Sequence, residues 1–300
     1  MAGDALSQDP AELRKRIDTT KAHPARVYDV FLGGKDNYPV DRDAAGAALA
    51  ANPRGYLDVR HNRDFMRRAV TTLAKDEGIR QFLDIGTGLP TAENVHQIAQ
   101  GIAPDTRVLY VDNDPVVLAH ARALLTSGPE GATDYIDADL REPARILEAA
   151  AKTLDFDQPV ALCLVAILHF IEDDEAYPIV RELVEALPAG SRLVLSHLTE
   201  DLNPANIRAV QETYTKRGFT FVLRSRDEVA RFFAQSGLVV EEPGVVPAHH
   251  WRFSDGAPVP PAVEPGAWAG MDDIEKVRYR DINDVTDADI NVYVAVGRKG

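Results

Sequence analysis

The chain has 300 residues, of which 45% are hydrophobic and 27% charged, and its net charge is −14 at pH 7. A chain of this length can bury a large core without disulfides or a structural metal, and its negative charge disfavours nonspecific binding to nucleic acids and anionic membranes. The single Cys163 lies in an apolar run, which excludes a disulfide framework and a cysteine-based zinc site. The longest apolar run, Val160–Leu168, is too short to cross a bilayer, and residues 1–23 lack an apolar stretch typical of a secretory signal, so we expect a soluble, cytoplasmic protein.

Residues 1–77 are predicted to form an N-terminal helical cap. Helices are expected over Ala25–Leu32, which Gly33-Gly34 ends, then from a capping Asp41 or Asp43 to about Asn52, and over Tyr56–Glu77. Residues 1–75 hold 13 Lys and Arg against 10 Asp and Glu, whereas the remainder holds 20 against 37. This contrast fits either solvated helix faces or cations brought to an anionic ligand, and charge counting alone favours the first.

From residue 78 onward, short apolar strands alternate with helices of about a dozen residues. Strands are expected at 81–86, 107–112, 133–139, 160–168 and 192–197, and the helices between them at 91–103, 115–125, 143–154 and 174–187. This alternation predicts an α/β domain over residues 78–300, with a parallel sheet and helices on both faces.

The end of the chain has a different pattern. Helices near 203–217 and 225–236 precede strands at 238–241 and 292–297. No crossover helix joins these two strands, so we expect them to pair in antiparallel fashion at the sheet edge. Between them, residues 257–291 contain 8 acidic and 3 basic residues and are expected to form an elaborated loop.

The strongest local signal is the glycine turn Asp84-Ile-Gly86-Thr87-Gly88 at the end of the first strand. Ligands of open α/β sheets bind outside the carboxyl ends of the strands, where glycine lets them approach the backbone amides. The next strand ends in Asp112, whose carboxylate can accept hydrogen bonds from both hydroxyls of an adenosine ribose, although capping of the following turn is an alternative. The third strand ends in Asp137-Ala138-Asp139, where Asp139 is placed to meet an adenine edge and Asp137 or a simple Asx turn competes.

The turn favours an adenosine ligand without a pyrophosphate. A dinucleotide fingerprint needs a third glycine or alanine, whereas this chain has Thr91 there, behind a proline. The loop also lacks a Walker lysine. S-adenosylmethionine is therefore the predicted cofactor, and NAD is disfavoured.

Several blocks of the sequence resemble the actinobacterial S-adenosyl methyltransferase family, long listed as a domain of unknown function. They are Arg26–Asp41 with its specific Leu-Gly-Gly-Lys-Asp-Asn core, Asn62–Phe65, Gln81–Thr91 and Tyr110–Pro115. The resemblance implies a class I methyltransferase fold. In that fold a Rossmann-like seven-stranded sheet ends in an antiparallel strand, carries helices on both faces and is joined by an N-terminal helical cap. The family supplies no substrate, and the acidic stretch 257–291 is longer than the resemblance leads us to expect.

Carried over by position, the resemblance implies a set of cofactor contacts. The methionine part of the cofactor is expected to lie over Asp84, Gly86, Thr87 and Gly88. The ribose is expected to be held by Asp112. The adenine is expected beside Asn113, with its edge hydrogen-bonded by Asp139 and the Leu140 amide, and Ala166 begins the floor of the site. Tyr28, Gly33, Lys35 and Asn37 are expected near the cofactor, and Arg63 is the candidate partner of its carboxylate. For Arg60, Arg63 and Arg67 a solvated helix face is the alternative. A core aromatic is the alternative for Tyr28, and a pair with Asp36 within the loop is the alternative for Lys35.

Histidines supply the remaining candidates. His169 follows the fourth strand and is predicted to be a general base or to line the pocket, because an imidazole titrates near working pH. His197 is a weaker second candidate. His249-His250 suggest a metal site, but adjacent histidines rarely face one ion and no third ligand is spaced to complete it, so no metal is predicted.

Three functions are compatible with these residues. The first is a methyltransferase that acts on a small-molecule acceptor by in-line displacement. The second is a protein that binds S-adenosylmethionine and regulates or binds a partner without methyl transfer. The third, disfavoured by Thr91, is an NAD-dependent oxidoreductase.

Overall fold

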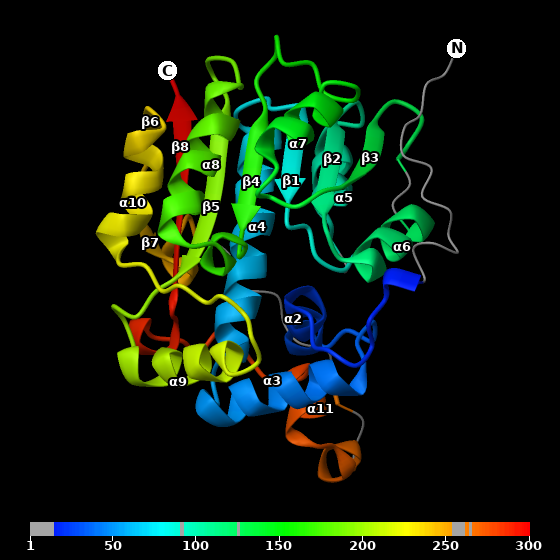
Figure 1. Ribbon diagram of the computed structural model, residues 1–300, viewed down its shortest axis with the longest axis vertical. Helices are drawn as coiled ribbons and strands as arrows, with labels where there is room; N and C mark the ends of the chain where they lie inside the picture. The colour runs from blue at the N-terminus through cyan, green and yellow to red at the C-terminus, as the bar shows by residue number, and fades with distance from the viewer. Residues whose placement is uncertain (1–14, 91–92, 125–126, 254–261, 264–265) are drawn as a thin grey trace.

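The computed structural model describes residues 15–90, 93–124, 127–253, 262–263 and 266–300. A single sheet runs through the molecule in the order β3-β2-β1-β4-β5-β8-β6, and β7 pairs with β8 beside β6 (Figure 1). The strands are β1 Gln81–Ile85, β2 Arg107–Asp112, β3 Ala132–Asp137, β4 Ala161–Val165, β5 Arg192–Leu198, β6 Leu238–Val240, β7 Val246–Pro247 and β8 Val292–Lys299. The first five are parallel, and β8 is antiparallel to β5, which confirms the predicted α/β sheet.

The seventh position in the sheet is shared by two short strands. Both β6 and β7 pair with β8 in antiparallel register, β6 along its end and β7 along its beginning. The sequence predicts β6 but not β7, because a two-residue strand that ends in proline is too short to show an alternation of apolar and polar residues.

Helices cover both faces of the sheet. They are α4 Tyr56–Lys75, α5 Val95–Ile102, α6 Pro115–Leu124, α7 Pro143–Ala150, α8 Asp173–Glu185 and α10 Arg226–Gln235. The alternation of strand side chains creates the two layers. Phe82 packs in the cluster that contains α4 and α5, whereas its neighbour Leu83 packs in the cluster that contains α7, α8 and α10.

A group of helices lies beyond the carboxyl ends of the parallel strands (Figure 1). It contains α2 Pro24–Leu32, α3 Pro39–Ala51, α9 Pro204–Thr215 and α11 Asp273–Val277, in which α3 packs on α2 and α9, and α11 on α2 and α3. The long α4 joins this group to the sheet, because it contacts both α2 and β4, β5 and β8. We call this group of helices, together with the beginning of α4, the cap. The cap faces the strand ends, which is where open α/β sheets bind their ligands.

The loop between α2 and α3 is organised by one buried carboxylate. Asp29 accepts hydrogen bonds from the Asp36 amide (3.1 Å) and from Asn37 Nδ2 (2.9 Å). Helix α3 begins at Pro39 and Asp41 is its third residue, where the carboxylate accepts from the Tyr38 amide (2.9 Å). Asp41 thus caps the helix as predicted, but from the third helical position, because Pro39 at the first position starts the helix earlier than expected.

Replacing Gly34 with alanine is expected to lower the free energy of unfolding by about 1–3 kcal/mol. A Cβ atom at this position overlaps the Asp29 carboxylate, which is 3% exposed and bonded to the loop. Gly46→Ala is the matched control, since a Cβ in that helical position meets nothing within 4 Å and is expected to stabilise by about 0.5–1 kcal/mol. Urea denaturation measures both, and equal effects of the two variants would contradict this account of the loop.

The described part of the acidic stretch packs against the N-terminal helices. Arg60 donates to the carbonyls of Val277 (2.5 Å) and Arg280 (2.9 Å), and the Nε2 atom of His61 lies 2.8 Å from the Ile282 carbonyl. Arg54 pairs with Asp289 (3.0 Å). The predicted loop thus contains short helices that support α2–α4; residues 257–261 and 264–265 lie outside the described residues. No helix within the described ranges is long and apolar enough to cross a membrane.

Candidate functional site

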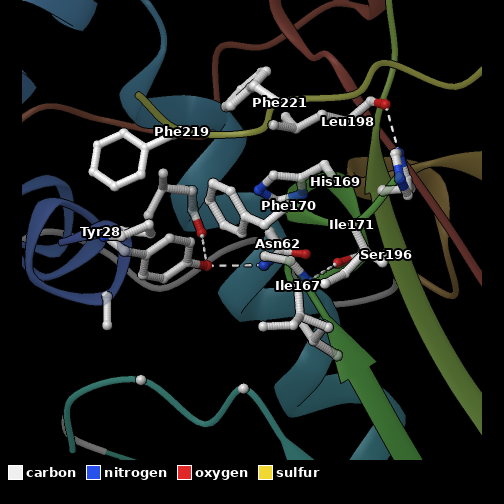
Figure 2. A pocket seen from close by; sticks show the side chains of 18 of the residues that line it. Tyr28, Asn62, Ile167, His169, Phe170, Ile171, Ser196, Leu198, Phe219 and Phe221 are labelled. Carbon is white, nitrogen blue, oxygen red and sulfur yellow. Dashed lines mark hydrogen bonds between the residues drawn. The ribbon is translucent and has the colours of Figure 1, made fainter. Parts of the chain in front are cut away.

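A cavity of about 420 Å³ lies between the strand ends and the helices of the cap. One side is formed by the segments after β1, β2, β3, β4 and β5, and the other by residues of α2, α3, α4 and α9 and by the segment after α9. Figure 2 views part of its lining, with side chains from α2, α4 and the end of β4 directed toward one another. This volume is within the usual range for small-molecule sites.

The glycine turn after β1 lines the cavity as predicted. Gly86 and Gly88 have φ values of 76° and 67°, a conformation that favours glycine. The Gly86 amide donates to the Val111 carbonyl (2.8 Å), and the Gly88 amide donates to Asp112 Oδ2 (2.9 Å). A Cβ atom on Gly86 would lie 2.5 Å from Ile167 Cδ1, so this glycine also allows the segment after β4 to approach. Thr91, on which the prediction against a dinucleotide cofactor depends, lies outside the described residues.

Asp112 anchors the end of β2 and faces the cavity. Its carboxylate is 7% exposed and also accepts from the Asp114 amide (2.9 Å), while burial raises its pKa. Asn113 Nδ2 donates to Asp139 Oδ2 (2.9 Å), and Asn113, Asp139 and Leu140 all line the same end of the cavity. Asp137 instead pairs with Arg16 (2.5 Å) and is not part of the lining, so the structure brings Asp139 rather than Asp137 to the site.

Asp84, at the end of β1, contributes a second carboxylate to the cavity. Burial raises its pKa to about 7, the Arg63 guanidinium opposes that shift, and the Asp112 carboxylate adds to it. No described residue donates a hydrogen bond to the Asp84 carboxylate. Arg63 lines the cavity nearby and donates to the Glu93 carbonyl (3.1 Å). A buried carboxylate without a donor is a fitting partner for a cationic ligand group.

The cap contributes Tyr28 from α2. Its hydroxyl donates to the Val59 carbonyl (3.1 Å) and accepts from Asn62 Nδ2 (2.8 Å), which fixes the ring against α4 in the cavity wall (Figure 2). His23 also lines the cavity, and its Nδ1 atom lies 2.9 Å from Oδ2 of Asp114, which is two residues after Asp112. The cap is thereby tied to the tip of β2.

Three residues of the Leu-Gly-Gly-Lys-Asp-Asn block lie away from the cavity. Gly33 ends α2 with φ 75°, and a Cβ atom there would lie 2.7 Å from Arg278 Cγ. Asn37 bonds Asp29 in the loop, and Lys35 is exposed. The structure therefore does not bring Gly33, Lys35 or Asn37 to the predicted cofactor, and their block serves the geometry of the α2–α3 loop. Arg60 and Arg67 are likewise engaged elsewhere, Arg67 with Asp64 (2.7 Å).

The segment after β4 brings Ala166 and His169 into the cavity wall. Ala166 has φ 57°, which is uncommon for a residue with a Cβ, and its amide donates to Ser196 Oγ (2.8 Å). The His169 ring lies 4.2 Å from Phe170 and 5.4 Å from Phe221, centroid to centroid. Burial lowers the pKa of His169 well below its usual value, so its imidazole is neutral at pH 7. Its Nδ1 has no hydrogen-bond partner among the described residues.

Arg224 holds this segment in place, and the sequence gives no sign of that role. The side chain is 1% exposed and donates to the carbonyls of Leu168 and Ile171 (both 2.9 Å) and to Asp173 (2.9 Å). Its Nη1 also lies 2.6 Å from His197 Nε2, and burial lowers the pKa of His197 to about 3. His197 is thus an acceptor for Arg224 rather than a residue free to take a proton from a ligand.

Sequence reasoning missed three groups that line the cavity. Asp58 accepts from the Asn291 amide (2.5 Å) and from its side chain (3.2 Å), and burial raises its pKa to about 7. Asn62 Oδ1 is buried without a described partner. Aromatic residues of α9 and the segment after it complete the wall. Asp58 and Asn62 are four residues apart on one helix, a spacing that could have marked a common face.

The structure supplies a third group to the adjacent histidines. Asp287 Oδ1 lies 3.1 Å from His249 Nε2 and 2.6 Å from His250 Nε2. The spacing of residues gave no sign of this third group, because Asp287 is 37 residues further along the chain than His250. These separations are those of hydrogen bonds, which attach the segment before β8 to the end of β7.

Comparisons with known proteins agree with the fold of the chain. A family model described as S-adenosyl methyltransferase matches residues 10–300. The chain is similar to a DUF574 family protein from Streptomyces avermitilis, with 44% identity and a TM-score of 0.84 over 95% of this chain and 100% of that one. It is also similar to a candidate methyltransferase from Thermobifida fusca, with 34% identity and a TM-score of 0.78 over 98% of this chain and 99% of that one. No curated protein matches the chain.

Proposed function

The chain belongs to the S-adenosyl methyltransferase family and is an S-adenosylmethionine-dependent methyltransferase by that membership, and we propose that its cavity binds this cofactor and a small-molecule acceptor together. The observation that carries the proposal is the convergence of Asp84, Gly88 and Asp112 on one cavity at the ends of β1 and β2.

The residues of the cavity fit this cofactor. The cofactor carries positive charge on its sulfonium and amino groups, and the Asp84 carboxylate lies in the cavity with no donor among the described residues. We assign the ribose hydroxyls to Asp112 and the adenine edge to Asn113, Asp139 and the Leu140 amide. The turn Gly86-Thr87-Gly88 lies under the methionine part, where Arg63 supplies positive charge for the carboxylate. Tyr28 and Ala166 complete the walls.

The cofactor supplies an electrophilic methyl group with its leaving group already attached. In the transfer, an oxygen or nitrogen of the acceptor forms a bond to the methyl carbon while the carbon–sulfur bond breaks and its electron pair stays on sulfur. The chain's task is to hold the two reactants in line and to exclude water. We assign to His169, which lines the cavity, a hydrogen bond from the hydroxyl or amine of the acceptor, because burial keeps its imidazole neutral, and the proton released in the transfer leaves to solvent with the product. Tyr28 and Asn62 close the cavity over the reacting groups.

A methyl-transfer assay distinguishes an enzyme from a protein that binds the cofactor without catalysis. Purified protein is incubated with S-adenosylmethionine labelled in its methyl group and with a small-molecule extract of the source cells. Label in a product that does not form with Asp112→Ala supports the enzyme. Tight binding of S-adenosylmethionine with no labelled product in any extract would favour a regulatory binding protein, and binding of NAD alone would exclude both.

Affinity for S-adenosylmethionine is expected to fall by up to about tenfold per pH unit as the pH is lowered below 7. The sign follows from Asp84, whose pKa is about 7 in the free protein. A cationic ligand prefers the ionised carboxylate, so protonation at lower pH competes with binding.

Calorimetry between pH 5.5 and 7.5 measures this dependence, and Asp84→Asn is expected to remove most of it. Asp58→Asn is the matched control, because Asp58 has a similar pKa but is bonded by Asn291. A pH dependence that survives in Asp84→Asn and disappears in Asp58→Asn would assign the cation to the other carboxylate.

A further inference from the structure

The part of the cavity beyond Ala166 is walled by aromatic rings. Phe170 follows β4, Tyr214 belongs to α9, and Phe219 and Phe221 come from the segment after α9. The ring centroids lie 4.8 Å apart for Tyr214 and Phe221, 5.9 Å for Tyr214 and Phe219, and 6.1 Å for Phe170 and Phe221. We call these four residues and His169 the aromatic chamber. Figure 2 shows Phe219, Phe221, His169 and Phe170 around the same part of the cavity.

The aromatic chamber is fixed by backbone hydrogen bonds. The Val222 amide donates to the His169 carbonyl (2.8 Å), and the Arg224 amide donates to the Leu198 carbonyl (3.1 Å). Gln211 of α9 donates to the Phe221 carbonyl (2.7 Å). The segment that carries Phe219 and Phe221 is therefore bonded to α9, β5 and the turn after β4, so a ligand meets a wall that is already formed.

Among the described residues that line the cavity, the only guanidinium groups are Arg63 and Arg141, and neither is free to meet an anion in the aromatic chamber. Arg141 lies at the edge of the chamber, but its donors are bonded to the Phe170 carbonyl (3.1 Å), to Glu175 (3.1 Å) and to Asp139 (3.4 Å). The charge of Arg63 acts on Asp84. Arg224 lies close to the chamber, but its donors are bonded to Asp173, His197 and two carbonyls. A carboxylate or phosphate placed there would lose its hydration without a counter-charge.

We propose that the methyl acceptor is an uncharged molecule whose aromatic ring packs against Phe170, Phe219 and Phe221 and whose hydroxyl or amine points toward His169. Offset and edge-to-face contacts between rings 4.5–7 Å apart suit the spacing of this wall. His169 and the Tyr214 hydroxyl are the polar groups of the chamber, and we place the acceptor's hydrogen-bonding atom beside His169 because this residue follows Ala166 at the end of β4. The transfer step rests on the proposed function, whereas the selection of a neutral ring rests on the chamber alone.

Three probes of similar size test the selection. Binding of 2-naphthol, decahydro-2-naphthol and 6-hydroxy-2-naphthoate is measured by calorimetry and saturation-transfer NMR, with and without S-adenosylhomocysteine. We expect saturable binding of 2-naphthol, binding of the saturated alcohol weaker by at least about threefold, and binding of the carboxylate weaker by more than about fiftyfold. Absence of 2-naphthol binding, or equal affinity for either of the other two probes, overturns the proposal.

Two variants locate the binding. Phe219→Leu is expected to weaken 2-naphthol binding by about five- to tenfold. Phe253→Leu, which alters an exposed ring outside the cavity, is expected to leave it unchanged. Equal effects of the two variants would overturn the assignment, and thermal unfolding verifies that both are folded. Binding of S-adenosylhomocysteine is measured in the same samples, so loss of cofactor binding with 2-naphthol binding intact contradicts the proposed function and not the chamber.

Discussion

Replacing Asp112 with alanine is expected to weaken the binding of S-adenosylmethionine by about 1.5–3 kcal/mol, a loss of about 10- to 150-fold in affinity. The carboxylate is buried at the end of β2 in the cavity wall, where we place the ribose hydroxyls. It also accepts from the amides of Gly88 and Asp114, so the variant removes two contacts that shape the turn under the cofactor. Calorimetry with S-adenosylmethionine and S-adenosylhomocysteine measures the loss, which we expect to be similar for both because the ribose is common to them.

Asp137→Ala is the matched control. Asp137 is the partner of Asp112 in the register of β2 and β3, but it pairs with Arg16 and does not line the cavity. Its replacement is expected to change cofactor affinity by less than about 0.5 kcal/mol. Unchanged affinity in the Asp112 variant, or an equal loss in the Asp137 variant, would remove Asp112 from the ribose site.

Arg224→Met is expected to lower the free energy of unfolding by about 2–4 kcal/mol and to slow methyl transfer strongly. Methionine keeps much of the apolar bulk but leaves the carbonyls of Leu168 and Ile171 and the His197 Nε2 without a donor. These groups frame the turn that carries His169, so its position is expected to loosen even in the folded protein. Urea denaturation measures the stability, and initial rates measured well below the unfolding transition give the activity.

Arg208→Met provides the comparison for Arg224. Arg208 pairs with Glu200 (2.5 Å) on the surface, where an exposed ion pair contributes little to stability. Its replacement is expected to leave both unfolding and turnover nearly unchanged. If Arg224→Met behaved like Arg208→Met, the buried guanidinium would have no positioning role. Affinity for S-adenosylhomocysteine should change little in either variant, because neither side chain lines the cavity.

The sheet and the cofactor half of the site could be predicted from the sequence for one physical reason. Alternating apolar strands and helices require parallel strands, and parallel strands bring their carboxyl ends to one edge. The turn Gly86-Thr87-Gly88 and the carboxylates of Asp112 and Asp139 were therefore predictable as neighbours, although 51 positions separate Gly88 from Asp139. The lack of a dinucleotide fingerprint and of a Walker lysine predicted the nature of the cofactor, and the resemblance to a family pointed to the same cofactor.

The position of His169 could be predicted, but the aromatic wall of the acceptor half could not, because its residues share no local pattern. Phe170 precedes Tyr214 by 44 positions, and the segments that carry them meet only through the tertiary fold. In the sequence, Arg224 is one more charged residue before a helix. In the structure it is buried and forms hydrogen bonds with four other residues. Conversely, the block around Gly33 and Asn37 looked like a binding motif because it is specific in sequence, whereas its glycines and amides serve a tight loop around Asp29.

A crystal structure of the complex with S-adenosylhomocysteine would show directly how the cavity holds the cofactor. We expect the nucleoside to lie across the ends of β1, β2 and β3, with both ribose hydroxyls within about 3 Å of the Asp112 carboxylate and with the amino group of the ligand beside Asp84. A ligand bound elsewhere, or a ribose with no contact to Asp112, would contradict this placement.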